Sequence, residues 1–155
     1  MSEYILPYPK ELLGLWRKGL VHRVWFWQYK GLFNQLDFDN ADGPQHREGM
    51  HFGEWFTAID FWTKGYKVLT EKYGLPGRKN SSTLMRILGP AGATFLTSGS
   101  VCRPDLMVYG PTYNLHSFVE VKRLREPLTD NQKKTFPIIE TTLGCQILIV
   151  RLKPV

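Results

Sequence analysis

Two acids and a lysine form the pattern in the sequence with the most chemical potential. Asp105 follows Pro104 and precedes an apolar run over residues 106–109, which predicts a strand between two turns. A second predicted strand carries Glu120 and Lys122, whose side chains point to the same face because side chains alternate along a strand. Two carboxylates beside an ammonium group can bind a hard divalent cation and orient a nucleophile. The pattern therefore predicts a metal site on two strands.

A helical pattern upstream supplies a third acid. Apolar residues over 47–64 recur at steps of three and four, which predicts a helix that ends at Gly65. Its apolar face consists of Phe52, Trp55, Phe56, Ile59 and Trp62. Glu48 lies on this face one turn before Phe52, whereas Glu54 and Phe61 project away from it. A carboxylate on a buried face is costly unless something pairs with it, so Glu48 is the expected third ligand.

Two other interpretations of these acids stay open. The helix dipole favours an acid at a helix start without any metal, which would also account for Glu48. Glu54 is a weaker alternative ligand.

Composition narrows the class of protein. The 155 residues are 43% apolar, which predicts one domain with a substantial core. The net charge of +6 favours a polyanionic partner, although a basic balance is also a common solubility feature. Cys102 and Cys145 are too few and too far apart for a disulfide framework or a four-ligand zinc site, so we expect reduced thiols in a cytoplasmic protein. We expect neither a secretion signal nor a membrane-spanning segment.

The elements that must position the acids alternate between helices and strands. Helices are predicted over residues 10–16, 47–64, 83–88 and 129–142. Strands are predicted over residues 65–70, 93–97, 106–109 and 145–152 and around Glu120. Residues 24–29 are either a buried strand or an interface patch, and residues 38–44 are predicted to be a loop. This order predicts an α/β sandwich with a central mixed sheet.

The last predicted helix has a clear start. Thr129 and Gln132 have the spacing of a capping box, in which each side chain bonds to the other residue's backbone N–H.

These motifs resemble those of a known nuclease superfamily. Pro104-Asp105 followed by Glu120-Val121-Lys122 is similar to the PD-(D/E)XK pattern of restriction endonucleases and junction resolvases. The spacing from that triplet to Glu126, Leu128 and Gln132 resembles the virus-type replication and repair nuclease branch (VRR-NUC). The resemblance covers about residues 46–152. Glu126 stands where the family more often has Asp.

The resemblance implies a restriction-endonuclease-like α/β/α sandwich with a nuclease domain over residues 46–155. Residues 1–45 would then be an N-terminal extension for dimerisation or DNA contact. The implied ligands of Mg²⁺ or Mn²⁺ are Glu48, Asp105, Glu120 and the backbone carbonyl of Val121. Lys122 would position or help deprotonate the attacking water, and Gln132 would support the site. The basic residues expected to contact DNA are Arg78, Lys79, Arg123, Arg125 and Lys133.

The predicted function is a Mg²⁺- or Mn²⁺-dependent DNA endonuclease. The resemblance implies branched or flapped DNA as substrate, including Holliday junctions, in replication or repair at nucleoid or host-cell DNA. It also implies a homodimer, for which residues 25–29 are a candidate surface. Two alternatives stay open: a non-catalytic DNA-binding or assembly subunit on the same fold, and a restriction endonuclease that reads a short duplex sequence.

Overall fold

The computed structural model of the chain describes residues 1–70, 73 and 80–155. In this part of the chain, five strands form one mixed sheet in the order β1-β5-β4-β3-β2. The strands are β1 (Ser2–Tyr8), β2 (Lys67–Leu69), β3 (Leu106–Tyr109), β4 (Leu115–Arg123) and β5 (Ile147–Pro154). Strands β1, β5 and β4 run parallel, whereas β3 is antiparallel to both β4 and β2.

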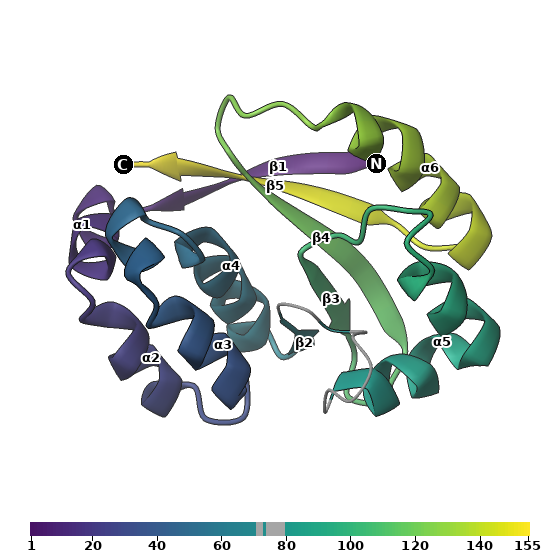
Figure 1. The fold of residues 1–155 in the computed structure, drawn as a ribbon, viewed down its shortest axis with the longest axis horizontal. Helices are drawn as coiled ribbons and strands as arrows, with labels where there is room; N and C mark the ends of the chain where they lie inside the picture. The colour runs from purple at the N-terminus through teal and green to yellow at the C-terminus, as the bar shows by residue number, and fades with distance from the viewer. Residues whose placement is uncertain (71–72, 74–79) are drawn as a thin grey trace.

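Helices cover both faces of this sheet. They are α1 (Lys10–Arg17), α2 (Val21–Gln28), α3 (Gln35–Ala41), α4 (Phe52–Thr63), α5 (Asn80–Thr97) and α6 (Asp130–Leu143), with a 3₁₀ turn η1 (Pro44–Glu48). Helices α1–α4 gather on one side, and α5 and α6 lie on the other (Figure 1). The predicted mixed α/β class is confirmed. No helix among the described residues is long and apolar enough to cross a bilayer, and Cys102 and Cys145 are free thiols, as expected.

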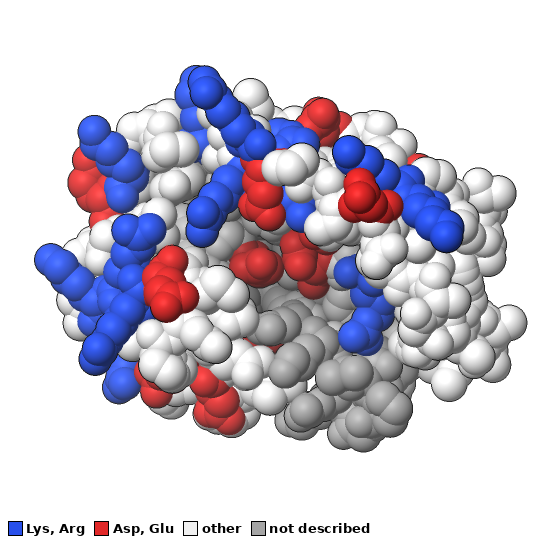
Figure 2. Space-filling model, turned by 45° about the horizontal axis from the view of Figure 1, so that its top comes forward, with Lys and Arg blue, Asp and Glu red and all other residues white. Residues whose placement is uncertain are grey.

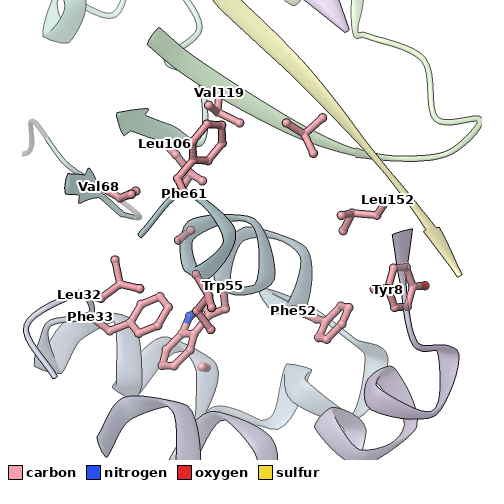
Figure 3. Packing of buried hydrophobic residues seen from close by; sticks show 14 of the residues in the cluster. Tyr8, Leu32, Phe33, Phe52, Trp55, Phe61, Val68, Leu106, Val119 and Leu152 are labelled. Carbon is pink, nitrogen blue, oxygen red and sulfur yellow. The ribbon is translucent and has the colours of Figure 1, made fainter. Parts of the chain in front are cut away.

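Helix α4 lies between the sheet and helices α1–α3, so it is buried on two sides (Figure 3). On the sheet side, Phe61 lies beside Leu106 and Val119. On the other side, the ring of Trp55 stacks on that of Phe33 with the centroids 3.7 Å apart. Phe61 does point away from the face that carries Trp55, as predicted, but the prediction of one apolar face was wrong, because Phe61 packs on the sheet and is 5% exposed. A helix covered from two directions needs apolar residues around most of its circumference.

The first 45 residues belong to the same sheet and the same core. Strand β1 pairs along its whole length with β5, and Tyr8 at its end is buried. Trp16 on α1 is fully buried and packs against Trp55 with ring centroids 5.5 Å apart. Its indole N–H donates to the backbone carbonyl of Met50, 2.9 Å away. These contacts fix α1 against the start of α4.

Two local predictions in the first 45 residues were wrong: the strand alternative for residues 24–29 and the loop over the whole of residues 38–44. Residues 24–29 belong largely to helix α2 and not to a strand; Trp25 packs inward while Val24 and Trp27 stay exposed. Residues 38–41 end helix α3 instead of lying in a loop. That helix starts at a capping box formed by Asn34 and Asp37, which the sequence analysis did not weigh.

The predicted strand over residues 93–97 is the end of helix α5. The backbone of α5 departs from helical geometry at Gly89, whose φ is 75°. Pro90 then starts the second half, where a missing N–H costs nothing. Ala93 and Leu96 are both buried, which is the spacing of one helix face over the second core. Packing on that core outweighs the β propensity of the Thr and Phe residues.

Gly53 sets how closely α4 approaches the sheet. A Cβ atom at this position would stand 2.8 Å from Cδ1 of Leu152 and 3.0 Å from Cγ1 of Val121. Only a residue without a side chain lets the first turn of α4 rest on strands β4 and β5 at this distance.

We expect Gly53→Ala to lower the free energy of unfolding by about 1–2 kcal/mol, because overpacking forces neighbouring side chains to shift. Urea unfolding followed by circular dichroism measures this change. Gly14→Ala in α1 is the matched control, because a Cβ there has no neighbour within 4 Å. It should raise stability by about 0.5–1 kcal/mol through helix propensity. Equal effects of both substitutions would contradict the close approach.

Candidate metal centre

Asp105 and Glu120 lie where the pairing of β3 with β4 ends. Leu106 pairs with Val119 in the last residue pair of this ladder. Beyond this pair, the backbone N–H groups of the two strands donate to the carboxylates of Asp105 and Glu120 instead of to backbone carbonyls. The backbone N–H of Val121 donates to Oδ2 of Asp105 at 2.9 Å. The backbone N–H of Asp105 donates to Oε2 of Glu120 at 3.2 Å. Each acid thus accepts a hydrogen bond from the backbone of the segment that carries the other acid. The motif predicted that the two acids lie on adjoining strands.

Glu120 is held from a third direction by helix α6. The side-chain amide of Gln132 donates to Oε1 of Glu120 at 2.7 Å. The predicted capping box is present: the backbone N–H of Gln132 donates to the Thr129 hydroxyl at 3.1 Å, and that of Thr129 to Oε1 of Gln132 at 3.0 Å. Both ends of the Gln132 amide are therefore engaged, and the start of α6 orients the Glu120 carboxylate.

Lys122 lies between two carboxylates. Its Nζ is 3.5 Å from Oε1 of Glu120 and 3.5 Å from Oε2 of Glu126. The other oxygen of Glu126 accepts from the backbone N–H of Arg123 at 3.1 Å. Glu120 is 4% exposed and Lys122 6% exposed, so both charges are at the bottom of the site.

Burial and mutual repulsion destabilise the ionised acids. Burial, followed by the charges of Glu54 and Glu120, raises the pKa of Asp105 well above its ordinary value, against the opposing effects of the Val121 N–H and Lys122. Burial also raises the pKa of Glu120, while Lys122 and Gln132 oppose this shift. An additional positive charge next to Asp105 would relieve the repulsion.

The third predicted acid, Glu48, is not on helix α4. The predicted helix over 47–64 is interrupted, because Gly49 and His51 adopt left-handed backbone conformations with φ of 82° and 69°. Glu48 ends the 3₁₀ turn η1 and is exposed, so its predicted place on the apolar face was wrong. Glu54, in the first turn of α4, is half-buried, and its charge acts on Asp105.

An open cleft of about 1250 Å³ contains this site. Figure 2 shows acidic side chains at the bottom of a hollow on this face, with Lys and Arg side chains along its edge. The acids that line the cleft are Glu48, Glu54, Asp105 and Glu126, and the basic residues are Arg17, Arg103, Lys122, Arg123 and Arg125.

The predicted DNA contacts have different outcomes. Arg123 and Arg125 line the cleft, whereas Lys133 is exposed on α6 and is not among the lining residues. Arg78 and Lys79 lie outside the described residues.

Tyr73 is a residue of the site that the sequence analysis missed. It is 2% exposed, and its hydroxyl donates to the backbone carbonyl of Pro104 at 2.7 Å. This bond holds the turn that precedes Asp105. The guanidinium of Arg103 lies over the Tyr73 ring, 5.9 Å from its centroid. A lone tyrosine in a turn-rich stretch carries no pattern from which this contact could be predicted.

The donor set fits a magnesium-like cation that keeps part of its water shell. Among the described residues, no group of three or more His, Cys, Asp or Glu side chains is arranged to hold a metal by itself. However, Mg²⁺ commonly takes only one or two carboxylates and fills its other positions with water and substrate phosphate. The Val121 N–H donates to Oδ2 of Asp105. Oδ1 of Asp105 accepts no hydrogen bond from the described residues, so it is open to a cation. Val121, whose backbone carbonyl is the other predicted ligand, lies next to Asp105, because its N–H donates to that carboxylate.

Comparisons of the chain with models of known protein families, with curated proteins and with solved structures found no match. Function therefore has to be inferred from the chemistry of the site itself.

We expect Asp105→Asn to stabilise the metal-free protein at pH 8 by about 1 kcal/mol, or about 2–4 °C in Tm. The amide oxygen can still accept from Val121, and one buried charge is removed. Because the folded-state pKa of Asp105 is raised, its proton stabilises the fold at low pH. That contribution is lost as pH rises from about 4 through the raised pKa.

Thermal melts in EDTA from pH 5 to 8 measure this effect. The wild type should lose more stability over this range than the Asn variant, and the two should converge at the acidic end. Adding Mg²⁺ should raise the Tm of the wild type more than that of the variant. If the Asn variant is less stable than the wild type at pH 8, the ionised form of Asp105 does not destabilise the folded protein.

Proposed function

We propose that the chain is a Mg²⁺- or Mn²⁺-dependent nuclease that hydrolyses phosphodiester bonds in DNA. The observation that carries this proposal is the contact of half-buried Asp105 and buried Lys122, which line an open cleft together with arginines, with the buried carboxylate of Glu120 directly behind them. Two like charges at close range destabilise a protein core, and replacing them with apolar residues would stabilise the fold. Their presence therefore favours a functional role.

The protein groups have distinct parts in the proposed reaction. Asp105 and Glu120 provide carboxylate oxygens, and Glu54 replaces Glu48 as the third acid because its charge reaches Asp105. A divalent cation held there would offset the charge that develops on the phosphate and acidify a bound water. Lys122 orients the attacking water or a phosphate oxygen with its ammonium group.

Supporting groups keep this geometry fixed. Gln132 holds the Glu120 carboxylate through a 2.7 Å hydrogen bond, and Glu126 keeps the Lys122 ammonium in place from its other side. A carboxylate has about four lone-pair sites, so Glu120 retains capacity for a cation while it accepts these bonds.

The fold and the assembly form a further part of the proposal. A mixed sheet with helices on both faces supports a restriction-endonuclease-like sandwich and membership of the VRR-NUC branch. We propose branched or flapped DNA as the substrate and a homodimer as the active form, acting on DNA in the cytoplasm. Val24 and Trp27 on α2, which are 60% and 76% exposed, are the candidate dimer contacts.

A non-catalytic DNA-binding subunit is the second candidate function. It is favoured by the lack of a compact three-acid group among the described residues. Such a protein would bind DNA through the same arginines but would leave the strands intact.

We expect the purified chain to cut DNA in the presence of Mg²⁺ or Mn²⁺ and not in EDTA. The assay uses linear duplex, flap, splayed-arm and four-way-junction DNA with labelled strands. Glu120→Ala and Lys122→Ala should each lower the rate about 10³-fold or more, since each removes a charge from the reacting centre. Cleavage that survives both substitutions would exclude this site, and binding without cleavage would favour the second candidate.

We expect Glu54→Gln to lower the cleavage rate by about 10–100-fold, whereas Glu48→Gln changes it less than about threefold. The reason is that Glu54 is near Asp105, while Glu48 is exposed at the edge of the cleft. Thermal melts confirm that both variants are folded. The opposite order of effects would restore Glu48 as the third ligand.

A further inference from the structure

Arg17 brings the N-terminal segment into the cleft. It is the last residue of α1, yet it lines the same cleft as Arg123, the last residue of strand β4, and Arg125 just after it. Residues from distant parts of the chain therefore place positive charge in one cleft. The sequence resemblance does not extend to α1, so no role follows for Arg17 from it.

The placement of Arg17 depends on a glycine. Its Nε and Nη2 atoms lie 3.3 Å and 3.6 Å from the position that a Cβ on Gly49 would occupy. The guanidinium thus rests close to the bare backbone of Gly49, where a Cβ atom would force a small shift of the Arg17 side chain. The preceding residue, Trp16, is fully buried and bonded to Met50, so the base of the Arg17 side chain is fixed. Both constraints reduce the entropy that a phosphate contact would cost.

The charge of Arg17 is not neutralised within the described chain. The arginines that pair with carboxylates there are Arg23, with Asp42, and Arg151, with Glu3. Arg17, Arg123 and Arg125 are in neither pair, although acids line the same cleft. A planar guanidinium with open donors on a cleft wall suits the bidentate binding of a phosphate.

The depth of the acids favours an unpaired strand. Lys122 lines the cleft but is only 6% exposed, and Glu120 beside it is 4% exposed, so a reacting phosphate must enter the cleft to come near them. A paired duplex holds its backbone on a stiff outer surface, whereas a single strand can bend into a positively charged groove.

We propose that Arg17 binds the backbone of an unpaired DNA strand on the α1 side of the cleft and so makes the N-terminal segment part of the substrate site. This inference rests on DNA being the ligand of the proposed function. It adds a binding residue and a strand preference that the acids alone do not specify.

The test measures binding separately from cleavage. The full chain is titrated in EDTA against a short fluorescent single-stranded oligonucleotide and the matching duplex, and anisotropy gives the Kd over a range of salt concentrations. Arg17→Ala should weaken single-strand binding about tenfold and reduce the slope of log Kd against log salt by about one. Arg17→Lys should recover part of the affinity but not all of it.

Lys18→Ala is the matched control. Lys18 is exposed at the end of the same helix, carries the same charge and does not line the cleft. Arg17 is also exposed, so the two residues differ in whether they line the cleft. The Lys18 substitution should change the Kd less than about twofold, because an exposed charge that makes no contact with the bound strand is largely screened by salt. Thermal melts check that both variants remain folded.

The outcomes separate this inference from the proposed function. Equal effects of Arg17→Ala and Lys18→Ala, or no binding by the intact chain, would overturn the role of Arg17. Equal affinity for duplex and single strand would overturn the preference for an unpaired strand. Binding that depends on Arg17, without cleavage in Mg²⁺ or Mn²⁺, would support the inference while the proposed hydrolysis fails.

Discussion

The structure is organised around the cost of holding Asp105 and Glu120 side by side with little water. Each carboxylate accepts a backbone N–H from the neighbouring strand, and Gln132 and Lys122 add two further contacts to Glu120. Such contacts reduce the cost of burial but do not remove it: burial still raises the pKa of both acids, and the charges of Glu54 and Glu120 raise that of Asp105 further. The β3–β4 pair and the start of α6 are thus joined by hydrogen bonds to the carboxylates of Asp105 and Glu120.

The helices on the α4 side determine how the acids meet the cleft. Helix α4 can rest on β4 and β5 only because Gly53 has no side chain, and this approach places Glu54 near Asp105. Trp16 in turn fixes α1 against the segment before α4. Residues far from the acids in sequence therefore help to set the electrostatic environment of Asp105, through the packing of α1 and α4.

Local patterns predicted the centre of the site, and tertiary packing decided its surroundings. The strand over residues 106–109, the shared face of Glu120 and Lys122, and the Thr129–Gln132 box are all short-range features, and each is present. Glu48 was misplaced because the periodic pattern does not reveal the left-handed residues that interrupt the helix before Phe52. Strand β1 was missed because β5, its partner among the described strands, lies at the opposite end of the sequence.

The pairing of β1 with β5 has a consequence for how the protein forms during synthesis. Ser2 pairs with Leu148, and β5 lies between β1 and β4 in the sheet. On the ribosome, β1 has to wait for β5, and one edge of the strand that carries Glu120 stays open until then. At about 5–20 residues per second this delay lasts many seconds. A nascent chain therefore cannot complete the sheet around Asp105 and Glu120 until nearly all of its 155 residues have been made.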